Sequence, residues 1–296
     1  MCTTFWQFFD EASDGSARFV LAFNRDEYFG RATAGFHEWE SQPSVCAPRD
    51  LEPEHPAEQG AWIGVNRRGL LALLTNFLEP NPEIGSVSRG ALVRGLLVHP
   101  PATPGGHAVA AQSNREIVRE YASAVFAERA QYSGFNLVLF DLAADGEVWY
   151  VTNRGSGSDS GGAVRCLPRA RPAGLSNSTI DRPWAKVDRG LQAFAAATAG
   201  GPPVSAHTVD ALMRLMADTG PFSAERPPRQ PSDLDHCIFV PRTRDPAKGL
   251  QSSAFGTRST EVLLLRGREL TIVEQCHDAD GADPKTIRFL LDIPLS

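Results

Sequence analysis

A cysteine directly behind the initiator methionine could carry nucleophilic chemistry. Cys2 becomes the chain terminus once Met1 is removed, and methionine aminopeptidases act when the second residue is small. Cys2 then holds a thiol, with an ordinary pKa of about 8.5, and an α-amine, with an ordinary pKa of about 7.7–8.0. The amine can accept the thiol proton and later give it to a leaving group, so one residue supplies both nucleophile and base.

A terminal ammonium needs a carboxylate to orient it, and the sequence offers Asp26. Strand alternation places Asn24 and Asp26 on one face of a strand that should pair with the strand of Cys2. Arg25 and Glu27 then share the opposite face. We predict that Asp26 binds the amine. Asn24 and Arg25 are candidate substrate contacts, and a structural ion pair with Glu27 is the alternative for Arg25.

The oxyanion that develops in an acyl transfer needs hydrogen-bond donors. Asparagine suits this role because it donates without altering the charge balance of the thiol. Two asparagines at the ends of apolar runs, Asn76 and Asn177, are the candidates. No histidine lies in a recognisable cysteine-protease signature. The predicted catalytic set is therefore Cys2, Asp26, Asn76 and Asn177.

Composition argues against several other classes of function. The chain has 296 residues, 42% of them hydrophobic, and a formal net charge of −6, so we expect a large core and no nucleic-acid surface. No apolar run approaches the roughly 20 residues of a membrane span, and no signal peptide is recognisable, so we expect a cytoplasmic protein. The five cysteines are odd in number and widely spaced, which favours reduced thiols. Neither cysteines nor histidines show zinc-ligand spacing, and no metal site is predicted.

The elements that must position these residues come as strands, helices, strands, helices and strands. Periodicity and turn residues predict strands at 3–9, 18–24, 61–66, 70–76, 135–142, 147–153, 237–241, 254–265 and 270–276. Helices are predicted at 91–98, 115–130, 184–197 and 206–217, the first two capped by Ser88 and Asn114. Surface loops are expected at 39–60 and 221–231, and a flexible Gly/Ser-rich tip at 155–162. Without a long linker, this order predicts one domain over 1–296, with sheets packed on each other and helices outside.

Several stretches resemble one known family, in order and over essentially the whole chain. The chain is similar to the NRDE family of transport and Golgi organisation proteins in the opening MC and in NRDE (24–27), AWIGVNRRGLLALLTNF (61–77), SRGALV (88–93), GFNLVLFD (134–141), GLSNS (174–178), PWAKV (183–187) and FGTRSTEVLLL (255–265). The resemblance implies an α+β class, a four-layer αββα N-terminal-nucleophile hydrolase fold with two stacked, mainly antiparallel sheets flanked by helices. The family has no agreed reaction, and its eukaryotic members have been linked to haem mobilisation and to lipid metabolism.

A more distant similarity is to cholylglycine and penicillin V acylases of the same fold, which also begin with Met-Cys. This resemblance implies that Asp26, Asn76 and Asn177 match an aspartate and two asparagines of the acylase site. The arginine that precedes the aspartate in the acylases is displaced here, since Phe23 stands at the equivalent spacing. A second, later arginine of the acylases has no assigned counterpart in this chain.

Three functions are compatible with these residues. In the first, the protein is an amidohydrolase whose cysteine attacks an acyl-amide, forms a thioester and lets water release the acid. No cofactor is required for that reaction. In the second, it is a non-enzymatic carrier of haem or another amphipathic ligand in the same cleft, with haem as cargo. The third is a partner-binding protein that keeps only the scaffold. The substrate and the oligomeric state are not predicted.

Overall fold

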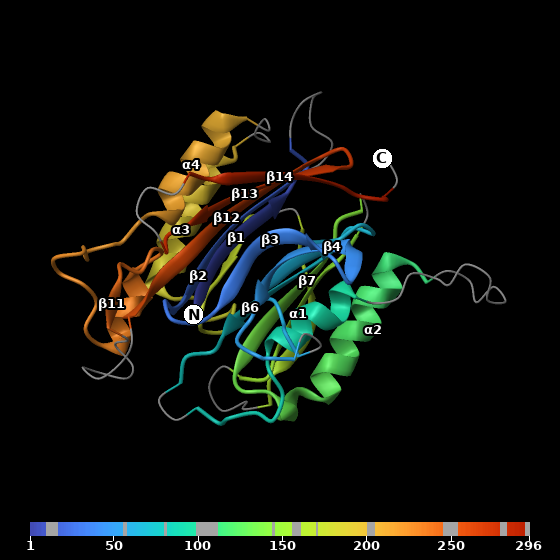
Figure 1. Cartoon of the computed structure of the whole chain (residues 1–296), viewed down its shortest axis with the longest axis horizontal. Coiled ribbons are helices and arrows are strands. Elements are labelled where there is room, and N and C mark those ends of the chain that lie inside the picture. The colour runs from blue at the N-terminus through green and yellow to red at the C-terminus, as the bar shows by residue number, and fades with distance from the viewer. Residues whose placement is uncertain are drawn as a thin grey trace. The chain divides into compact units, whose positions relative to one another are not determined.

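The computed structural model describes residues 1–9, 17–55, 58–79, 82–98, 112–143, 146–155, 161–169, 171–199, 205–244, 254–278 and 283–293. The chain divides into two compact units, and each contains an antiparallel sheet and a pair of helices (Figure 1). The first unit comprises Met1–Ala32 and Arg169–Phe289, and the second Thr33–Pro168 and Leu290–Ser296. This confirms the α+β class and the two mainly antiparallel sheets.

The sheet of the first unit has its strands in the order β10-β1-β2-β12-β13-β14, and β11 pairs with β12. The strand bounds are β1 Cys2–Phe8, β2 Phe19–Tyr28, β10 Ala173–Leu175, β11 Thr243–Arg244, β12 Ala254–Arg266, β13 Glu269–Cys276 and β14 Lys285–Leu290. The helices are α3 Ala185–Ala197 and α4 Ala206–Met216, with a 3-10 turn, η2, at Pro231–His236. The first strand is therefore an interior strand, with β2 on one side and β10 on the other.

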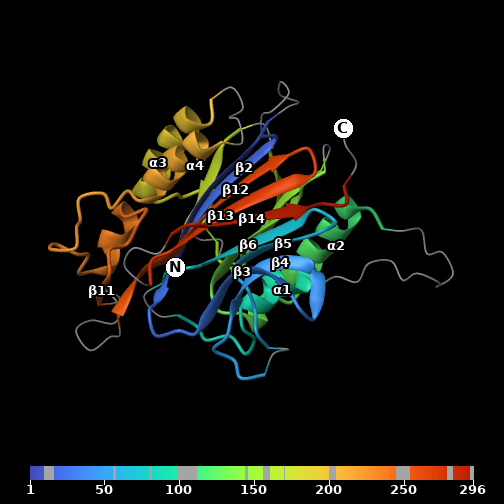
Figure 2. The same cartoon turned by 45° about the horizontal axis from the view of Figure 1, so that its top comes forward.

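Helices α3 and α4 cover one face of this sheet (Figure 2). The apolar residues that alternate along β1, β2 and β12 meet the apolar stripes of both helices in one buried cluster: Phe5, Ala17, Val20, Ala22, Val187, Phe194, Leu212, Leu215, Met216, Ile238, Val262 and Leu264. Helix α3 comes close to β1 at Gly190, where a Cβ atom would lie 2.2 Å from Cζ of Phe5. The absence of a side chain at Gly190 thus sets how near α3 lies to the strand that begins with Cys2.

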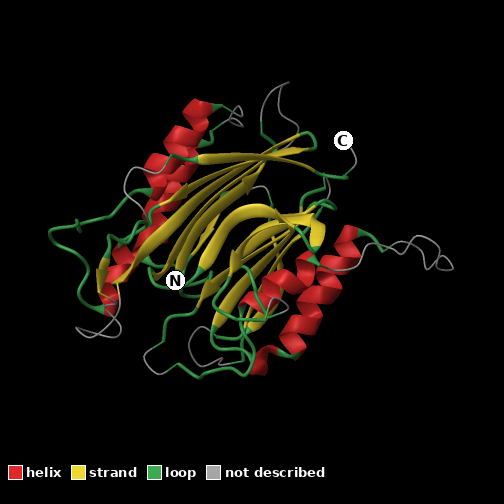
Figure 3. Ribbon diagram, viewed as in Figure 1, coloured by secondary structure: helices red, strands yellow, loops and turns green. Residues whose placement is uncertain are grey.

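The sheet of the second unit follows chain order, from β3 to β9. Its strands are β3 Thr33–Trp39, β4 Gln42–Asp50, β5 Ile63–Asn66, β6 Leu70–Asn76, β7 Phe135–Asp141, β8 Val148–Thr152 and β9 Ala163–Leu167. Helices α1 (Gly90–Leu97) and α2 (Asn114–Ala127), followed by the 3-10 turn η1 (Arg129–Gln131), pack on one face of the sheet (Figure 3). Every residue of β7 is buried, as its continuous apolar run predicts.

The segment 39–60 is not the surface loop that its prolines and glutamates predict. Residues 42–50 form β4, which pairs with β3 along most of its length and with β5 at Val45 and Cys46. Val45, Cys46 and Ala47 are fully buried. The prediction of a loop was wrong because it relied on the prolines. A strand tolerates proline wherever the ladder does not need the missing N–H.

The segment 237–241 is not the strand that its apolar residues predict. Ile238 and Val240 are buried. The backbone N–H groups of the segment, however, donate hydrogen bonds to residues of different elements and not to one neighbouring strand. Phe239 N donates to Asp218 O at 2.8 Å, and Val240 N donates to the hydroxyl of Thr257 at 2.8 Å. The segment packs as an apolar loop beside a bulge of β12 and joins no ladder.

Two helix starts also differ from the prediction. Helix α1 begins after Arg89, and no side chain caps it, whereas Ser88 was the expected cap. Helix α2 is capped one residue before the predicted Asn114, by Ser113 in a capping box with Glu116.

The predicted tip at 155–162 lies mostly outside the described residues. Among the described residues, no helix combines the length and apolarity needed to cross a membrane.

The close approach of α3 to β1 gives a stability prediction. Gly190→Ala should lower the free energy of unfolding by about 1–2 kcal/mol. A Cβ only 2.2 Å from Phe5 puts the overpacking cost in the upper part of the usual range of about 1–3 kcal/mol, and this outweighs the gain of up to about 1 kcal/mol in helix propensity. Urea unfolding measures the change. Gly30→Ala is the matched control, since a Cβ at Gly30 meets nothing within 4 Å. Equal stabilities of the two variants would contradict the close packing.

Candidate active site

Cys2 is the first residue of β1 and is buried, with 6% of its surface exposed. The register of β1 with β2 places it directly opposite Arg25. Burial raises the pKa of the Cys2 thiol to about 12, although the positive chain terminus opposes that rise. In the chain that still carries Met1, the thiol is therefore protonated at neutral pH.

Asp26 lies one position beyond that pair, opposite Met1. The Met1 ammonium donates to the backbone oxygen of Asp26 at 2.5 Å, and Asp26 N donates to Met1 O at 2.6 Å. The side chain of Asp26 is 1% exposed, and its Oδ1 accepts a hydrogen bond from the Thr257 hydroxyl at 2.6 Å. Its Oδ2 is also buried and has no hydrogen-bond partner among the described residues. One acceptor of this carboxyl group is thus unsatisfied near the start of the chain.

The electrostatics of Asp26 are set mainly by burial. Burial raises the pKa of the Asp26 carboxyl, while the Lys186 ammonium and the chain terminus act against that rise. The bond from Thr257 also acts against the rise because it favours the charged form, and the pKa of Asp26 stays above its ordinary value. Asp26 is therefore a buried carboxyl group whose charge depends on neighbouring cations.

Asn177, the first candidate oxyanion donor, is brought near Cys2 because β10 pairs with β1. The pair Thr4 and Leu175 is the last of that ladder toward the start of β1. Beyond it, the hydroxyl oxygen of Ser176 lies 2.8 Å from the carbonyl oxygen of Cys2 and 3.0 Å from Oδ1 of Asn177. Asn177 is fully buried. The first unit thus brings Cys2 and Asn177 together through one serine.

Asn24 and Arg25, the two candidate substrate contacts, interact mainly with other groups of the chain. Asn24 is fully buried, and its amide donates to the backbone oxygens of Met216 and Ile238 at 2.8 and 2.9 Å. Its side-chain oxygen accepts from the Thr260 hydroxyl at 2.7 Å. Asn24 therefore joins β2 to the end of α4 and to the loop after η2. Arg25 lies 3.9 Å from Glu27, which is the ion pair foreseen as its alternative role.

Asn76 belongs to the second unit, at the end of β6 opposite Phe135. The chain that follows it is anchored at once, since Phe77 N donates to Gly134 O at 2.9 Å. Cys2 belongs to the first unit and Asn76 to the second. Its role as an oxyanion donor therefore stays a prediction.

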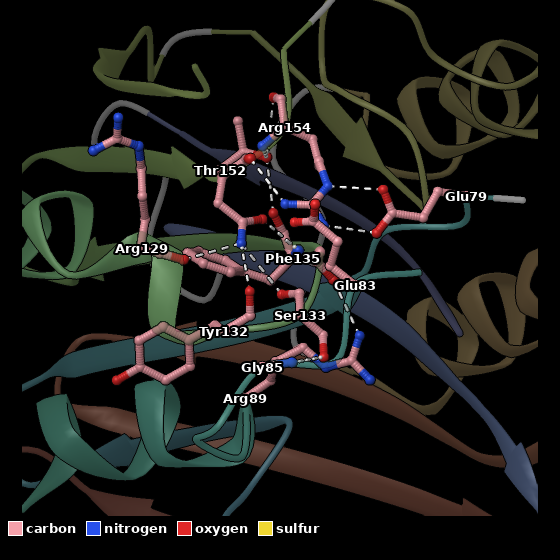
Figure 4. Close-up of polar contacts among 12 residues, drawn as sticks. Glu79, Glu83, Gly85, Arg89, Arg129, Tyr132, Ser133, Phe135, Thr152 and Arg154 are labelled. Carbon is pink, nitrogen blue, oxygen red and sulfur yellow. Dashed lines mark hydrogen bonds and ion pairs between the residues drawn. The ribbon is translucent and has the colours of Figure 1, made fainter. Parts of the chain in front are cut away.

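A polar network holds the loop that follows Asn76 within the second unit (Figure 4). Glu79 accepts two hydrogen bonds from Arg154, each of 2.8 Å, and Gly85 N donates to the Ser133 hydroxyl at 2.9 Å. Asn153 donates to the carbonyl oxygens of Arg129, Tyr132 and Ser133, and Arg89 donates to Gly134 O. Bidentate arginine–carboxylate pairs fix geometry better than single bonds do. The end of β6 is thus held firmly in its own unit.

Lys186 is a member of the site that the sequence-based prediction missed. It lies in the first turn of α3, is 1% exposed and interacts electrostatically with Asp26, Cys237, Asp235 and Cys2. Burial lowers the pKa of its ammonium, and these four groups oppose the decrease. A lysine within the buried stripe of an amphipathic helix was the available signal, and the chain has only three lysines.

The other titratable thiols do not form a second cluster. Cys46 and Cys237 are buried, whereas Cys166 and Cys276 are exposed. Within the described part of the chain, no group of three or more His, Cys, Asp or Glu side chains could hold a metal ion.

Comparison with known proteins identifies relatives over nearly the whole chain. The family described as Transport and Golgi organisation 2 matches residues 1–278. A Transport and Golgi organization protein 2 homolog from Bos taurus is 31% identical over 296 residues, covering 98% of this chain and 94% of the relative. The homolog from Homo sapiens is 28% identical over 301 residues, covering 100% of this chain and 95% of the relative.

Solved structures give weaker similarities. The C2A mutant of a conjugated bile acid hydrolase from Clostridium perfringens is 14% identical with a TM-score of 0.43, covering 100% of this chain and 99% of that one. An N-acylethanolamine-hydrolyzing acid amidase ortholog from Caenorhabditis elegans is 11% identical with a TM-score of 0.43, covering 90% of this chain and 100% of that one. Similarity at this level does not establish a shared activity.

The bond between Thr257 and Asp26 gives a second stability prediction. Thr257→Val removes the hydroxyl on which both Asp26 Oδ1 and the backbone N–H of Val240 depend. Because two buried polar groups lose a partner, we expect the free energy of unfolding to fall by about 2–4 kcal/mol. Urea unfolding at neutral pH measures it, and Thr257→Ser, which keeps the hydroxyl, should lose much less. A valine variant as stable as the serine variant would rule out this bond.

The raised thiol pKa predicts how the unprocessed chain reacts. Protein made while methionine aminopeptidase is inhibited keeps Met1, and its Cys2 should be nearly inert to iodoacetamide at pH 7.5. The rate should rise about tenfold per pH unit toward pH 12, because only the thiolate reacts. Peptide mapping by mass spectrometry measures labelling at each cysteine. The exposed Cys166 is the internal control, and rapid labelling of Cys2 at pH 7.5 would contradict the pKa.

Proposed function

The chain belongs to the Transport and Golgi organisation 2 family, and we propose that it is an N-terminal-nucleophile hydrolase that uses Cys2 to cleave an acyl-amide C–N bond. The observation that carries the proposal is the buried Asp26 carboxylate, whose Oδ2 has no hydrogen-bond partner in the described part of the chain. A buried acceptor without a partner is unfavourable. Removal of Met1 gives Cys2 an ammonium group beside that acceptor.

The first role of this chain's residues is to hold the new terminus. Asp26 accepts a hydrogen bond from the Cys2 ammonium and keeps it oriented, and Thr257 fixes the carboxylate from its other oxygen. The nearby ammonium favours the thiolate, so the pKa of the Cys2 thiol falls below the value of about 12 that burial gives it in the unprocessed chain. This ammonium–thiolate pair forms when the neutral α-amine takes the proton of the thiol, so that one residue supplies both the nucleophile and its base.

In the acylation step, Cys2 Sγ forms a bond to the carbonyl carbon of the substrate, and the C–N bond breaks. The α-ammonium gives its proton to the leaving nitrogen, which departs as a neutral amine. In the second step, water attacks the thioester carbon and passes a proton to the α-amine. The C–S bond breaks, the acid leaves, and the thiol and amine return to their starting state. No redox partner is needed.

The oxyanion in both steps is stabilised by neutral amide donors. Asn177 fits because it is fully buried and is tied to the backbone of Cys2 through Ser176. Asn76 is proposed as a second donor on the pattern of the sequence alone. Donors of this kind contribute about 3–4 kcal/mol each to transition-state stabilisation in other hydrolases.

A carrier of haem or another amphipathic ligand is the alternative function. It predicts saturable binding without turnover and needs no free amine at Cys2. No feature of the described residues favours haem over other ligands. Retention of Met1 in the cell would make the carrier the better explanation, because the α-amine would then be absent from Cys2.

The decisive experiment combines processing and turnover. We expect the intact mass of untagged protein from the cell to lack one methionine, and a panel of acyl-amides to include a substrate. Cys2→Ala should abolish turnover while the unfolding midpoint stays near that of the wild type, and Cys166→Ala, at an exposed cysteine, should leave turnover unchanged. Unchanged turnover in Cys2→Ala would refute the mechanism.

A further inference from the structure

Lys186 is a buried cation that acts on Asp26, the carboxylate used in the proposed mechanism. Of the groups that lower the pKa of Asp26, Lys186 has the largest effect. It lies on the buried stripe of α3, which also contains Gly190 and Phe194. Gly190 packs against Phe5 of β1, and Lys186 lies one helical turn earlier on the same side of the helix. Asp26 is on the same face of β2 as Val20 and Ala22, which pack with Val187 and Phe194 of α3, so Asp26 and Lys186 both lie between the sheet and the helix. Among the groups that support the charge of Lys186, Asp26 has the largest effect.

The position of Lys186 is unfavourable for a cation in two respects. Its side chain is 1% exposed, and removing an ammonium from water requires a compensating anion. Lys186 is also the second residue of α3, where the helix dipole is positive and favours anions. A lysine retained under both conditions indicates a strong anionic partner.

Groups from several elements face Lys186. Asp26 comes from β2 and Cys2 from β1, while Asp235 belongs to η2 and Cys237 follows it. Asp235 is only half-buried, so water screens its charge more than that of Asp26. The ring of Trp184, 5.2 Å from Nζ, adds a cation–π contact. The dominant buried anion is therefore Asp26.

We propose that Lys186 is a positioning residue that keeps the Asp26 carboxylate ionised, and thereby allows Asp26 to hold the Cys2 ammonium and favours the Cys2 thiolate. The inference rests on the proposed function of Cys2. Without Lys186, burial would drive Asp26 to its neutral form, which binds an ammonium poorly. Lys186 itself does not touch the reacting atoms.

The charges of the groups around Cys2 show why the thiolate form of Cys2 is favoured over the thiol. In the processed chain, the ammonium groups of Lys186 and Cys2 contribute two positive charges and Asp26 contributes one negative charge, while the charge of Arg25, opposite Cys2, is balanced by Glu27. A thiolate at Cys2 brings this buried set to neutrality, whereas a thiol leaves one uncompensated positive charge. Because an uncompensated buried charge is costly, the set favours the reactive form of the nucleophile.

Thiol reactivity tests the proposal without a substrate. The protein would be processed chain, confirmed by intact mass, and the probe iodoacetamide, with labelling of Cys2 followed from pH 5 to 10. We expect Lys186→Met to raise the apparent pKa of the Cys2 thiol by about one unit, which lowers labelling below that pKa about tenfold. Lys186→Arg should restore most of the reactivity because it keeps the charge. Lys285→Met, at an exposed lysine, is the control and should leave the profile unchanged.

The outcomes separate this inference from the proposed function. An unchanged pH profile in Lys186→Met would overturn the role of Lys186, even if Cys2 proves to be the nucleophile. A shifted profile that arginine restores would support it, even if no acyl-amide is turned over. A shifted profile that arginine does not restore would overturn it, because the effect would then follow packing and not charge.

Unfolding provides a second test if Lys186→Met is too unstable to label. Asp26→Asn, Lys186→Met and the double variant form a cycle whose urea midpoints report the coupling of the two side chains. Each single change leaves a buried group without its partner, so we expect the double variant to have a higher midpoint than Lys186→Met alone. If the midpoint changes of the two single variants add up to the change in the double variant, the proposed interaction between Asp26 and Lys186 is overturned.

Discussion

The fold around the first strand is constrained by a carboxyl group that is removed from water. Asp26 is buried at the point where the chain begins, and burial favours its neutral form. The groups around it compensate for that cost from different parts of the chain. Thr257 comes from β12, Lys186 from α3 and the ammonium from the terminus itself. A single buried carboxyl group therefore links three parts of the chain that are far apart in sequence.

The same carboxyl group also depends on the register between β1 and β2. The ladder between β1 and β2 places Cys2 opposite Arg25 and the terminus opposite Asp26. Because side chains alternate along a strand, a shift of one residue would turn the carboxylate away from the helix that carries its cation. Interior placement of β1, with β10 on its other side, fixes that register from both edges.

The sequence was informative where the chemistry depends on strand periodicity. It predicted the pairing of the first two strands, the face of Asp26 and the place of Asn177 at the end of a short strand, since each follows from alternation and turn residues. Lys186 was missed because its function depends on which helix face meets β1, and this is decided by packing at Gly190. The strand β4 and the loop 237–241 were misassigned because tertiary partners, and not local propensity, decide their hydrogen bonds.

The place of β1 inside its sheet has a consequence for the order of events during synthesis. The strand emerges first from the ribosome, but its neighbour β10 begins only at Ala173 and β12 only at Ala254. At ordinary elongation rates, the whole chain takes roughly 15–60 s to complete. During that interval the terminus is accessible to the aminopeptidase, whereas in the finished fold its amine is bonded to the backbone of Asp26. Folding and removal of Met1 would thus compete, and the late synthesis of β10 and β12 leaves time for the removal.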